Sequence, residues 1–162
     1  MKPIKTLLTI LFISLLSSPS WSVTFDDLVE RNDLYYEKFT NVPFTGKVTG
    51  REQGSFKNGE RHGAWISYHE NGQLWYEGDY KSGKQEGAWV RYHKNGQLES
   101  KGNYKNGMSE GALVRYYETG QLESKANYKN GMWDGAWVRY YETGQLEFKG
   151  NFKDMFWEGP WV

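Results

Sequence analysis

The feature that most constrains this chain is a sequence repeat with a fixed period of 24 residues. Two adjacent units, residues 87–110 and 111–134, are identical at 17 of 24 positions without a gap. The same frame fits residues 63–86 and 135–158, with a shortened unit before it at 44–62 and the start of another at 159–162. Self-similarity at this period is typical of arrays in which each unit packs only on its neighbours.

Two further segments precede the array. Residues 1–22 carry two lysines, an apolar run from Leu7 to Leu16, and small residues at Ser20 and Ser22. This pattern predicts a Sec-type signal peptide and export to the periplasm or the cell exterior, with an uncleaved N-terminal anchor as the alternative. Residues 23–43 do not follow the repeat, and we expect them to form an N-terminal cap that covers the first edge of the array. Asn32-Asp33 indicates a hairpin within this cap, and a helical turn over residues 26–31 is the alternative.

Glycine marks two turns in each unit. Mid-unit turns contain Asn-Gly or Thr-Gly, as at Thr119-Gly120, and unit-end turns contain Ser-Gly or Asn-Gly, as at Asn130-Gly131. Glycine supplies the positive φ that two-residue hairpin turns require, so each unit is expected to form two antiparallel strands. The last unit has Asp154-Met155 at this place and no glycine, which predicts that the final turn is looser or differently built.

Two-residue turns would also fix the strand register. The pairs predicted on one face are Tyr117 with Leu122, Arg115 with Ser124, Leu113 with Ala126, Tyr128 with Trp133, and Ser124 with Trp137. The pairs predicted on the other face are Tyr116 with Glu123 and Val114 with Lys125. Both turns place the same side chains on one face, as a meander requires.

Because the period is even, the same face recurs in every unit. We call the face with the tryptophan positions the aromatic face and the other the charged face. The residues predicted on the aromatic face are Trp65, Trp89, Leu113 and Trp137, with Leu74, Leu98, Leu122 and Leu146, and Tyr80, Tyr104, Tyr128 and Phe152. Each tryptophan position lies across from glycine or alanine, which leaves room for a ring. The sequence therefore predicts an all-β fold, an elongated single-layer antiparallel β-meander of 24-residue hairpins.

Composition excludes several classes of function. The chain has no cysteine, and hence no disulfide framework or thiol chemistry. Its 20 basic and 20 acidic residues alternate along the units, so neither a nucleic acid nor an anionic membrane is the expected partner.

No catalytic or metal-binding pattern is present, and we expect no enzyme and no cofactor. His69 and His93 share a repeat position that is tyrosine in the next two units, and equivalent residues two strands apart are about 9–10 Å from each other, too far to share a zinc ion. The glutamates at 99, 123 and 147 recur with the period, whereas a catalytic carboxylate pair needs two unlike environments. These charges are interpreted as solvated ladders.

The repeat also resembles a known family. The pattern G-x-W-x-x-Y-x-x-x-G-Q-L-x-x-x-G-x-Y-K-x-G, which starts at Gly63 and recurs in the next units, is similar to the bacterial variant of the MORN repeat. The segment from Leu28 onward, closing with Asn41-Val42-Pro43-Phe44-Thr45-Gly46-Lys47, resembles the lead segment of YwqK-like antitoxin proteins. This resemblance implies an immunity component of a toxin-antitoxin system, which binds and masks a protein toxin.

Binding is therefore the expected function, through tryptophan, tyrosine and arginine residues that recur along one face and are enriched in interface hot spots. The candidate contacts are Trp65, Trp89, Arg91, Arg115, Tyr117, Trp137, Arg139 and Tyr141. The alternative for the tryptophans is that they hold a thin sheet together. A glycan-binding protein of the cell envelope and a membrane-associated scaffold remain alternative functions, and a monomer is expected.

We expect what is specific to this protein to lie at positions where the units differ from one another. Such positions include Leu113, His93 against Tyr117, Ser109 against Trp133, and the turn at Asp154-Met155.

Overall fold

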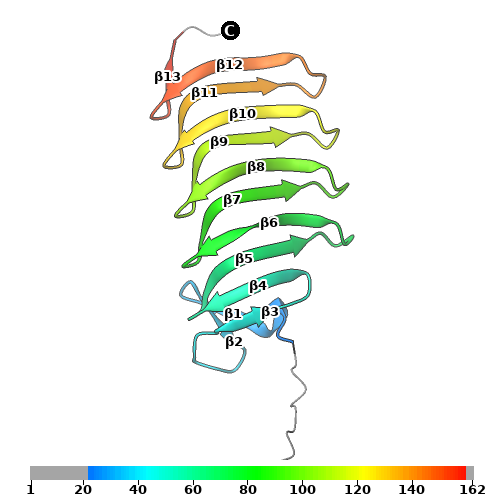
Figure 1. The fold of residues 1–162 in the computed structure, drawn as a ribbon, viewed down its shortest axis with the longest axis vertical. Coiled ribbons are helices and arrows are strands. Elements are labelled where there is room, and N and C mark those ends of the chain that lie inside the picture. The colour runs from blue at the N-terminus through cyan, green and yellow to red at the C-terminus, as the bar shows by residue number, and fades with distance from the viewer. Residues whose placement is uncertain (1–21, 160–162) are drawn as a thin grey trace, which may run out of the picture.

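The structure is a computed structural model that describes residues 22–159 as one open antiparallel sheet with a small hairpin at its N-terminal end (Figure 1). Strand order in the sheet follows the chain from β3 to β13. The described elements are the 3₁₀-helix η1 (Phe25–Asp27), β1 (Leu28–Arg31), β2 (Leu34–Glu37), β3 (Gly46–Val48), β4 (Glu52–Lys57), β5 (Glu60–Tyr68), β6 (Leu74–Lys81), β7 (Lys84–Tyr92), β8 (Leu98–Lys105), β9 (Met108–Tyr116), β10 (Leu122–Lys129), β11 (Met132–Tyr140), β12 (Leu146–Lys153) and β13 (Phe156–Glu158). The all-β meander of hairpin repeats is thereby confirmed.

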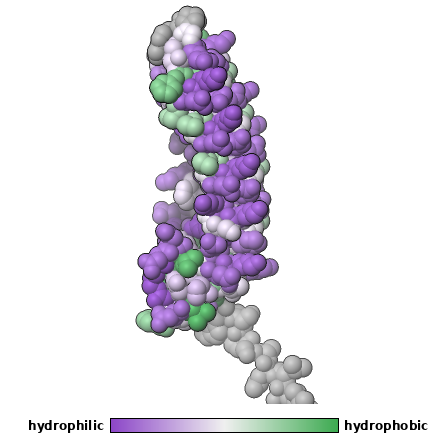
Figure 2. Space-filling model, turned by 90° about the vertical axis from the view of Figure 1, so that its left-hand side faces the viewer, coloured by the Kyte–Doolittle hydropathy of each residue, from purple (hydrophilic) through white to green (hydrophobic). Residues whose placement is uncertain are grey.

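The sheet is a long ladder whose mid-unit turns lie along one side and whose unit-end turns lie along the other (Figure 1). Seen towards the unit-end turns, the molecule is a narrow column with a mostly hydrophilic surface (Figure 2). The predicted signal peptide, residues 1–22, lies outside the described residues except for Ser22, and so does most of the last partial unit, 159–162.

The unit-end turns have the predicted two-residue form. Asn106 and Gly107 have φ angles of 52° and 82°, both positive as a type I′ turn requires. The prediction that the final turn is looser or differently built is wrong, because Asp154 and Met155 adopt the same conformation with φ angles of 48° and 69°. Pairing of β12 with β13 directly beside this turn holds the methionine in a left-handed conformation that favours glycine.

The mid-unit turns are longer than predicted. The Tyr117 N–H donates to the Gln121 carbonyl (2.9 Å) and the Gly120 N–H donates to the Tyr117 carbonyl (2.8 Å). These bonds close a three-residue loop, 118–120, in which Gly120 has a φ of 84° and Thr119 has no positive φ. The prediction of a two-residue turn at Thr119-Gly120 is therefore wrong, since that turn needs positive φ at both positions, whereas a three-residue loop needs it only at the glycine.

The longer turn creates a bulge at Glu123, where β10 has one more residue than β9. Leu122 pairs with Tyr116, and Ser124 pairs with Arg115. Because of this bulge, two predicted pairs are wrong: Tyr117 with Leu122, and Tyr116 with Glu123.

A slip of one residue moves side chains to the opposite face of a sheet. The residues predicted on the aromatic face that instead pair with tyrosines of the charged face are Leu74, Leu98, Leu122 and Leu146. Glu123 moves the other way and lies on the aromatic face, with its carboxylate 3.6 Å from the Arg139 guanidinium. The interpretation of this glutamate as part of a solvated ladder is wrong for that reason.

A second irregularity lies near each unit-end turn. Between β10 and β11, Asn127 alone lies opposite residues 134–136, where Gly135 has a φ of 107°. Trp137 therefore pairs with Ala126, and the predicted pair of Ser124 with Trp137 is wrong. The predicted pairs that the structure confirms are Arg115 with Ser124, Leu113 with Ala126, Val114 with Lys125, and Tyr128 with Trp133.

The main apolar cluster lies at the N-terminal end, where the hairpin of β1 and β2 packs on the array. Its members are Leu28, Phe44, Val48, Phe56 and Trp65, with Val23, Phe25, Tyr35 and Tyr80 beside them. The expected hairpin at Asn32-Asp33 is confirmed, with both residues at positive φ. Thr24, ahead of the hairpin, forms an isolated parallel bridge with Thr49, which directly follows β3.

Candidate functional site

The predicted contact residues at the N-terminal half of the aromatic face are buried. The exposed fractions of Trp65 and Trp89 are 0% and 3%. The Trp65 ring lies over Gly54 and the Trp89 ring over Gly78, so close that an added Cβ would be 2.3 Å and 2.4 Å from the two indoles. Both tryptophans therefore hold the sheet together, which was the alternative role, and they offer a partner no surface.

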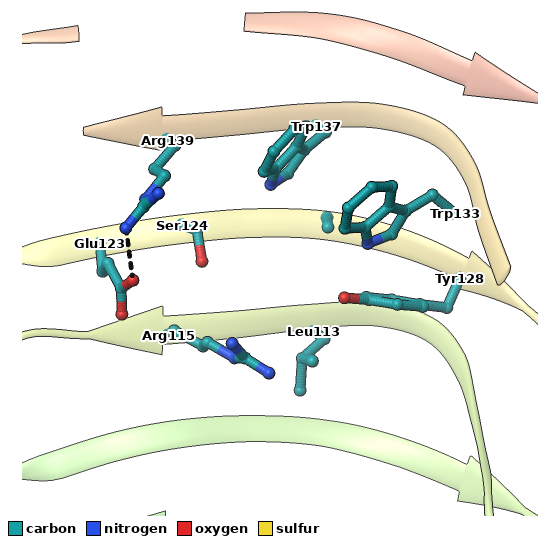
Figure 3. A pocket seen from close by; sticks show the side chains of 9 residues that line it. Leu113, Arg115, Glu123, Ser124, Tyr128, Trp133, Trp137 and Arg139 are labelled. Atoms are coloured by element: carbon teal, nitrogen blue, oxygen red, sulfur yellow. Dashed lines mark ion pairs between the residues drawn. The ribbon is translucent and has the colours of Figure 1, made fainter. Parts of the chain in front are cut away.

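Leucine replaces tryptophan at this position in the third unit, and a hollow lies beside it. The hollow has a volume of about 200 Å³. It is lined by Leu113, Arg115, Glu123, Ser124, Ala126, Tyr128, Trp133, Trp137 and Arg139. We call it the Leu113 hollow (Figure 3). Strands β9, β10 and β11 supply all of these residues, so the hollow spans the boundary between two units.

Alanine in place of glycine explains why Trp137 does not fill the hollow. Ala126 occupies the position that corresponds to Gly78 under Trp89, where a Cβ would overlap an indole in the usual orientation. The Trp137 ring instead stacks on Trp133, with 4.9 Å between the ring centroids and 16° between their planes. The two stacked rings form one wall of the hollow (Figure 3).

The three predicted arginines differ in their partners. Arg91 donates to the Tyr104 hydroxyl (3.4 Å), and Arg139 lies 3.6 Å from Glu123 and 3.2 Å from Glu147. Arg115 is exposed and has no ion pair or hydrogen bond to another side chain within residues 22–159. The structure thus brings Arg115, Arg139 and Trp137 together at the Leu113 hollow and leaves Arg91 outside it.

The predicted contacts Tyr117 and Tyr141 belong to the mid-unit turns, away from the hollow. The Tyr117 hydroxyl donates to the Tyr140 carbonyl (2.8 Å), one unit further along the chain. His69 and His93 make the equivalent bond through Nε2 to the carbonyls of the next unit, each at 2.8 Å. The histidines thus substitute for the tyrosine structurally, and residues 22–159 contain no cluster of side chains suited to a metal ion.

Arg61 is surrounded by aromatic and acidic groups at the N-terminal end of the aromatic face. Arg61 lies over the Trp65 ring (4.6 Å) and 3.2 Å from the Glu52 carboxylate. Burial works to lower the pKa of Arg61, but Tyr80, Tyr76 and Glu52 nearby raise that pKa overall. Burial raises the pKa of the Tyr76 hydroxyl. Arg61 thus holds these aromatic and acidic groups together at the N-terminal end of the aromatic face.

The sequence pointed to only some of the residues that line the Leu113 hollow. Sequence reasoning marked Leu113 and Trp133 as places where units differ, and both residues line the hollow. It treated Ala126 as equivalent to the glycines at the same position and so missed its effect on Trp137. The available signal was the joint change of Trp to Leu and of Gly to Ala within the third unit.

Comparison with known proteins agrees with the repeat seen in the structure. The family model described as MORN repeat variant matches residues 61–82, 85–106, 109–130 and 133–154. None of the curated proteins matches the chain. No helix within residues 22–159 has the length and apolar character that a membrane crossing requires. Four consecutive matches, each spanning two strands and the mid-unit turn between them, show that this chain belongs to the MORN repeat variant family.

Proposed function

We propose that this protein is a non-enzymatic binding module whose aromatic face holds a partner protein at the Leu113 hollow. The observation that carries the proposal is the hollow itself, which places two stacked tryptophans next to an unpaired arginine. Tryptophan and arginine dominate the binding energy of protein interfaces when they line a pocket. Elsewhere on this face the corresponding rings are buried against the sheet.

The more specific proposal is that the partner is a toxin and that binding neutralises it. Its support is the resemblance of the lead segment, from Leu28 to Lys47, to YwqK-like antitoxin proteins. The signal-peptide pattern at residues 1–22 supports an encounter in the periplasm or outside the cell. The chain would act as a monomer.

Glycan binding and membrane association have less support. Sugar recognition would use neighbouring exposed rings on which a sugar can stack. Trp65 and Trp89 expose no such surface, and the exposed Trp75 and Tyr141 lie in different units. A membrane scaffold would need an excess of basic residues, whereas the chain has equal numbers of basic and acidic ones.

The test is affinity capture from the envelope fraction with the protein and two variants. Trp133→Ser introduces the residue of the preceding unit and removes one wall of the hollow, whereas Lys149→Gln changes the opposite face. We expect a partner that binds the wild type and the Lys149 variant and is lost with Trp133→Ser. Equal capture by all three proteins would show that the aromatic face is not the binding surface. Co-expression of a captured toxin, with survival as the readout, tests neutralisation.

A further inference from the structure

We propose that the Leu113 hollow recognises an acidic-aromatic pair within the partner chain, a carboxylate side chain bound by Arg115 next to an aromatic side chain seated against Leu113 and Trp137. This inference rests on the proposed function and gives it a chemical specificity. Three observations carry it: the unpaired charge, the size and walls of the hollow, and the groove that continues past Arg115.

Charge complementarity selects the carboxylate. Arg115 faces Ser100 on β8 and Ser124 on β10, two short neutral side chains. The other cation of the hollow, Arg139, is paired, since it lies 3.2 Å from the Glu147 carboxylate and 3.6 Å from the Glu123 carboxylate. Arg115 has no ion pair within residues 22–159, and a guanidinium pairs with a carboxylate through two parallel hydrogen bonds.

The size and walls of the hollow select the aromatic side chain. Its volume of about 200 Å³ is below the range of roughly 300–1,000 Å³ that is typical of small-molecule sites. The hollow therefore suits one large side chain. Trp133, Trp137 and Tyr128 present rings on one side of it, and Leu113 forms the floor near Arg115 (Figure 3). Aromatic side chains in such settings prefer offset or edge-to-face contacts with neighbouring rings.

A second hollow indicates that the bound segment crosses the sheet. It has a volume of about 300 Å³ and shares Leu113, Arg115 and Glu123 with the first. The groove is thus open on both sides of Arg115, so an internal segment of the partner fits it better than a chain terminus.

The experiment uses a library of random peptides, displayed on phage and selected on the immobilised protein. We expect enrichment of peptides in which Asp or Glu adjoins Phe, Tyr or Trp. The leading peptide, made synthetically, should bind with a change in tryptophan fluorescence. Replacing its acidic residue by the amide should weaken binding about tenfold or more, since a hydrogen bond to a charged group contributes about 1.5–3 kcal/mol.

Two variants of the protein test the site directly. Leu113→Trp restores the residue of the other units, and its ring would lie over Gly102 on β8 as the Trp89 ring lies over Gly78. It would therefore fill the second hollow and close the groove on the β8 side of Arg115. Arg115→Gln removes the charge. Each substitution should weaken binding of the peptide about tenfold or more. The matched controls on the charged face, Val114→Ile and Lys125→Gln, should bind as the wild type does.

Three results would overturn the inference: no enriched peptide, enriched peptides without an acidic-aromatic pair, or unchanged binding by both hollow variants. Thermal unfolding confirms that the variants are folded, and Arg115→Gln decides the matter if Leu113→Trp fails to fold. The proposed function is tested separately. A captured partner that needs Trp133 but tolerates Leu113→Trp and Arg115→Gln would leave the function standing and remove this specificity.

Discussion

At the residue scale, a tryptophan ring rests on the glycine of the preceding unit, and this contact is the repeated packing element of the aromatic face. The same position offers a matched pair of substitutions. A Cβ at Gly78 would lie 2.4 Å from the Trp89 indole, whereas a Cβ at Gly102 would lie 2.6 Å from the end of the flexible Leu113 side chain. We predict that Gly78→Ala lowers the free energy of unfolding by about 1–3 kcal/mol, as overpacking does, and that Gly102→Ala costs clearly less.

Urea denaturation of both variants checks this prediction. The two glycines occupy equivalent backbone positions, so replacing either by alanine lowers the entropy of the unfolded chain by the same amount. The difference in unfolding free energy between the two variants therefore reports the contact with the indole ring. Equal costs for the two variants would contradict the role given to the indole.

A second residue-scale prediction concerns alkaline pH. Burial raises the pKa of Tyr76 above its ordinary value of 10.0. The folded state therefore holds this proton more tightly than the unfolded state, so the stabilisation is present below pH 10 and is lost as pH rises through the folded-state pKa. We expect the free energy of unfolding to fall more steeply above pH 10 in the wild type than in Tyr76→Phe, measured by urea denaturation across this range. Parallel slopes would contradict the prediction.

At the element scale, the final unit-end turn lacks the glycine that the preceding unit-end turns contain. The final unit-end turn holds Met155 at a φ of 69°, where the preceding turns have glycine. A left-handed conformation costs a non-glycine residue about 1–2 kcal/mol. Met155→Gly should therefore stabilise the hairpin of β12 and β13 by about 1 kcal/mol, measured as slower amide hydrogen exchange in these strands.

The reverse change is the control for this turn. Gly131→Met introduces the same strain at φ 79° between β10 and β11 and should destabilise that hairpin by a similar amount. An absence of effect in both variants would show that these turns relax to accept a side chain.

The mid-unit turns are joined to one another by a ladder of hydrogen bonds. The Tyr117 hydroxyl donates to the Tyr140 carbonyl, and His93 makes the corresponding bond to the Tyr116 carbonyl. We predict that Tyr117→Phe lowers the free energy of unfolding by about 0.5–1.5 kcal/mol, the usual contribution of one hydrogen bond. Tyr117→His keeps a hydrogen-bond donor at this position and should lower the free energy of unfolding less. Thermal unfolding compares the two variants. A less stable Tyr117→His than Tyr117→Phe would contradict the role of the ladder.

At the scale of the whole molecule, stability follows from contacts between neighbouring units, because each strand of the array pairs only with its sequence neighbours. Deleting one complete unit, residues 87–110, keeps the even period and both faces. We expect the shortened protein to fold, with a smaller dependence of unfolding free energy on urea because less surface is buried. Circular dichroism with urea denaturation measures this.

Deleting residues 87–109 is the matched control. The loss of an odd number of residues reverses the faces beyond the deletion, placing charged side chains where rings should pack. This variant should fail to fold cooperatively. Equal behaviour of the two deletions would show that the period does not set the register.

The outcome at particular residues shows how far the sequence could predict the molecule. The pairs of Leu113 with Ala126 and of Arg115 with Ser124 follow from counting back from the turns, and the structure confirms both. Leu122 was misplaced, because a turn of two residues and a loop of three carry the same glycine signal but differ by one residue in register. That single residue also brings Glu123 to the side of Arg139.

The sequence by itself determined the repeat, its even period, the hairpin architecture and the positions at which one unit departs from the next. Local chemistry is sufficient for these, because glycine placement and alternation act within a few residues. Only the tertiary structure decided which face the bulged residues take, where the Trp137 ring lies, and that Arg115 is left without a partner. These depend on backbone conformation and on contacts between neighbouring units, and residue spacing does not encode them.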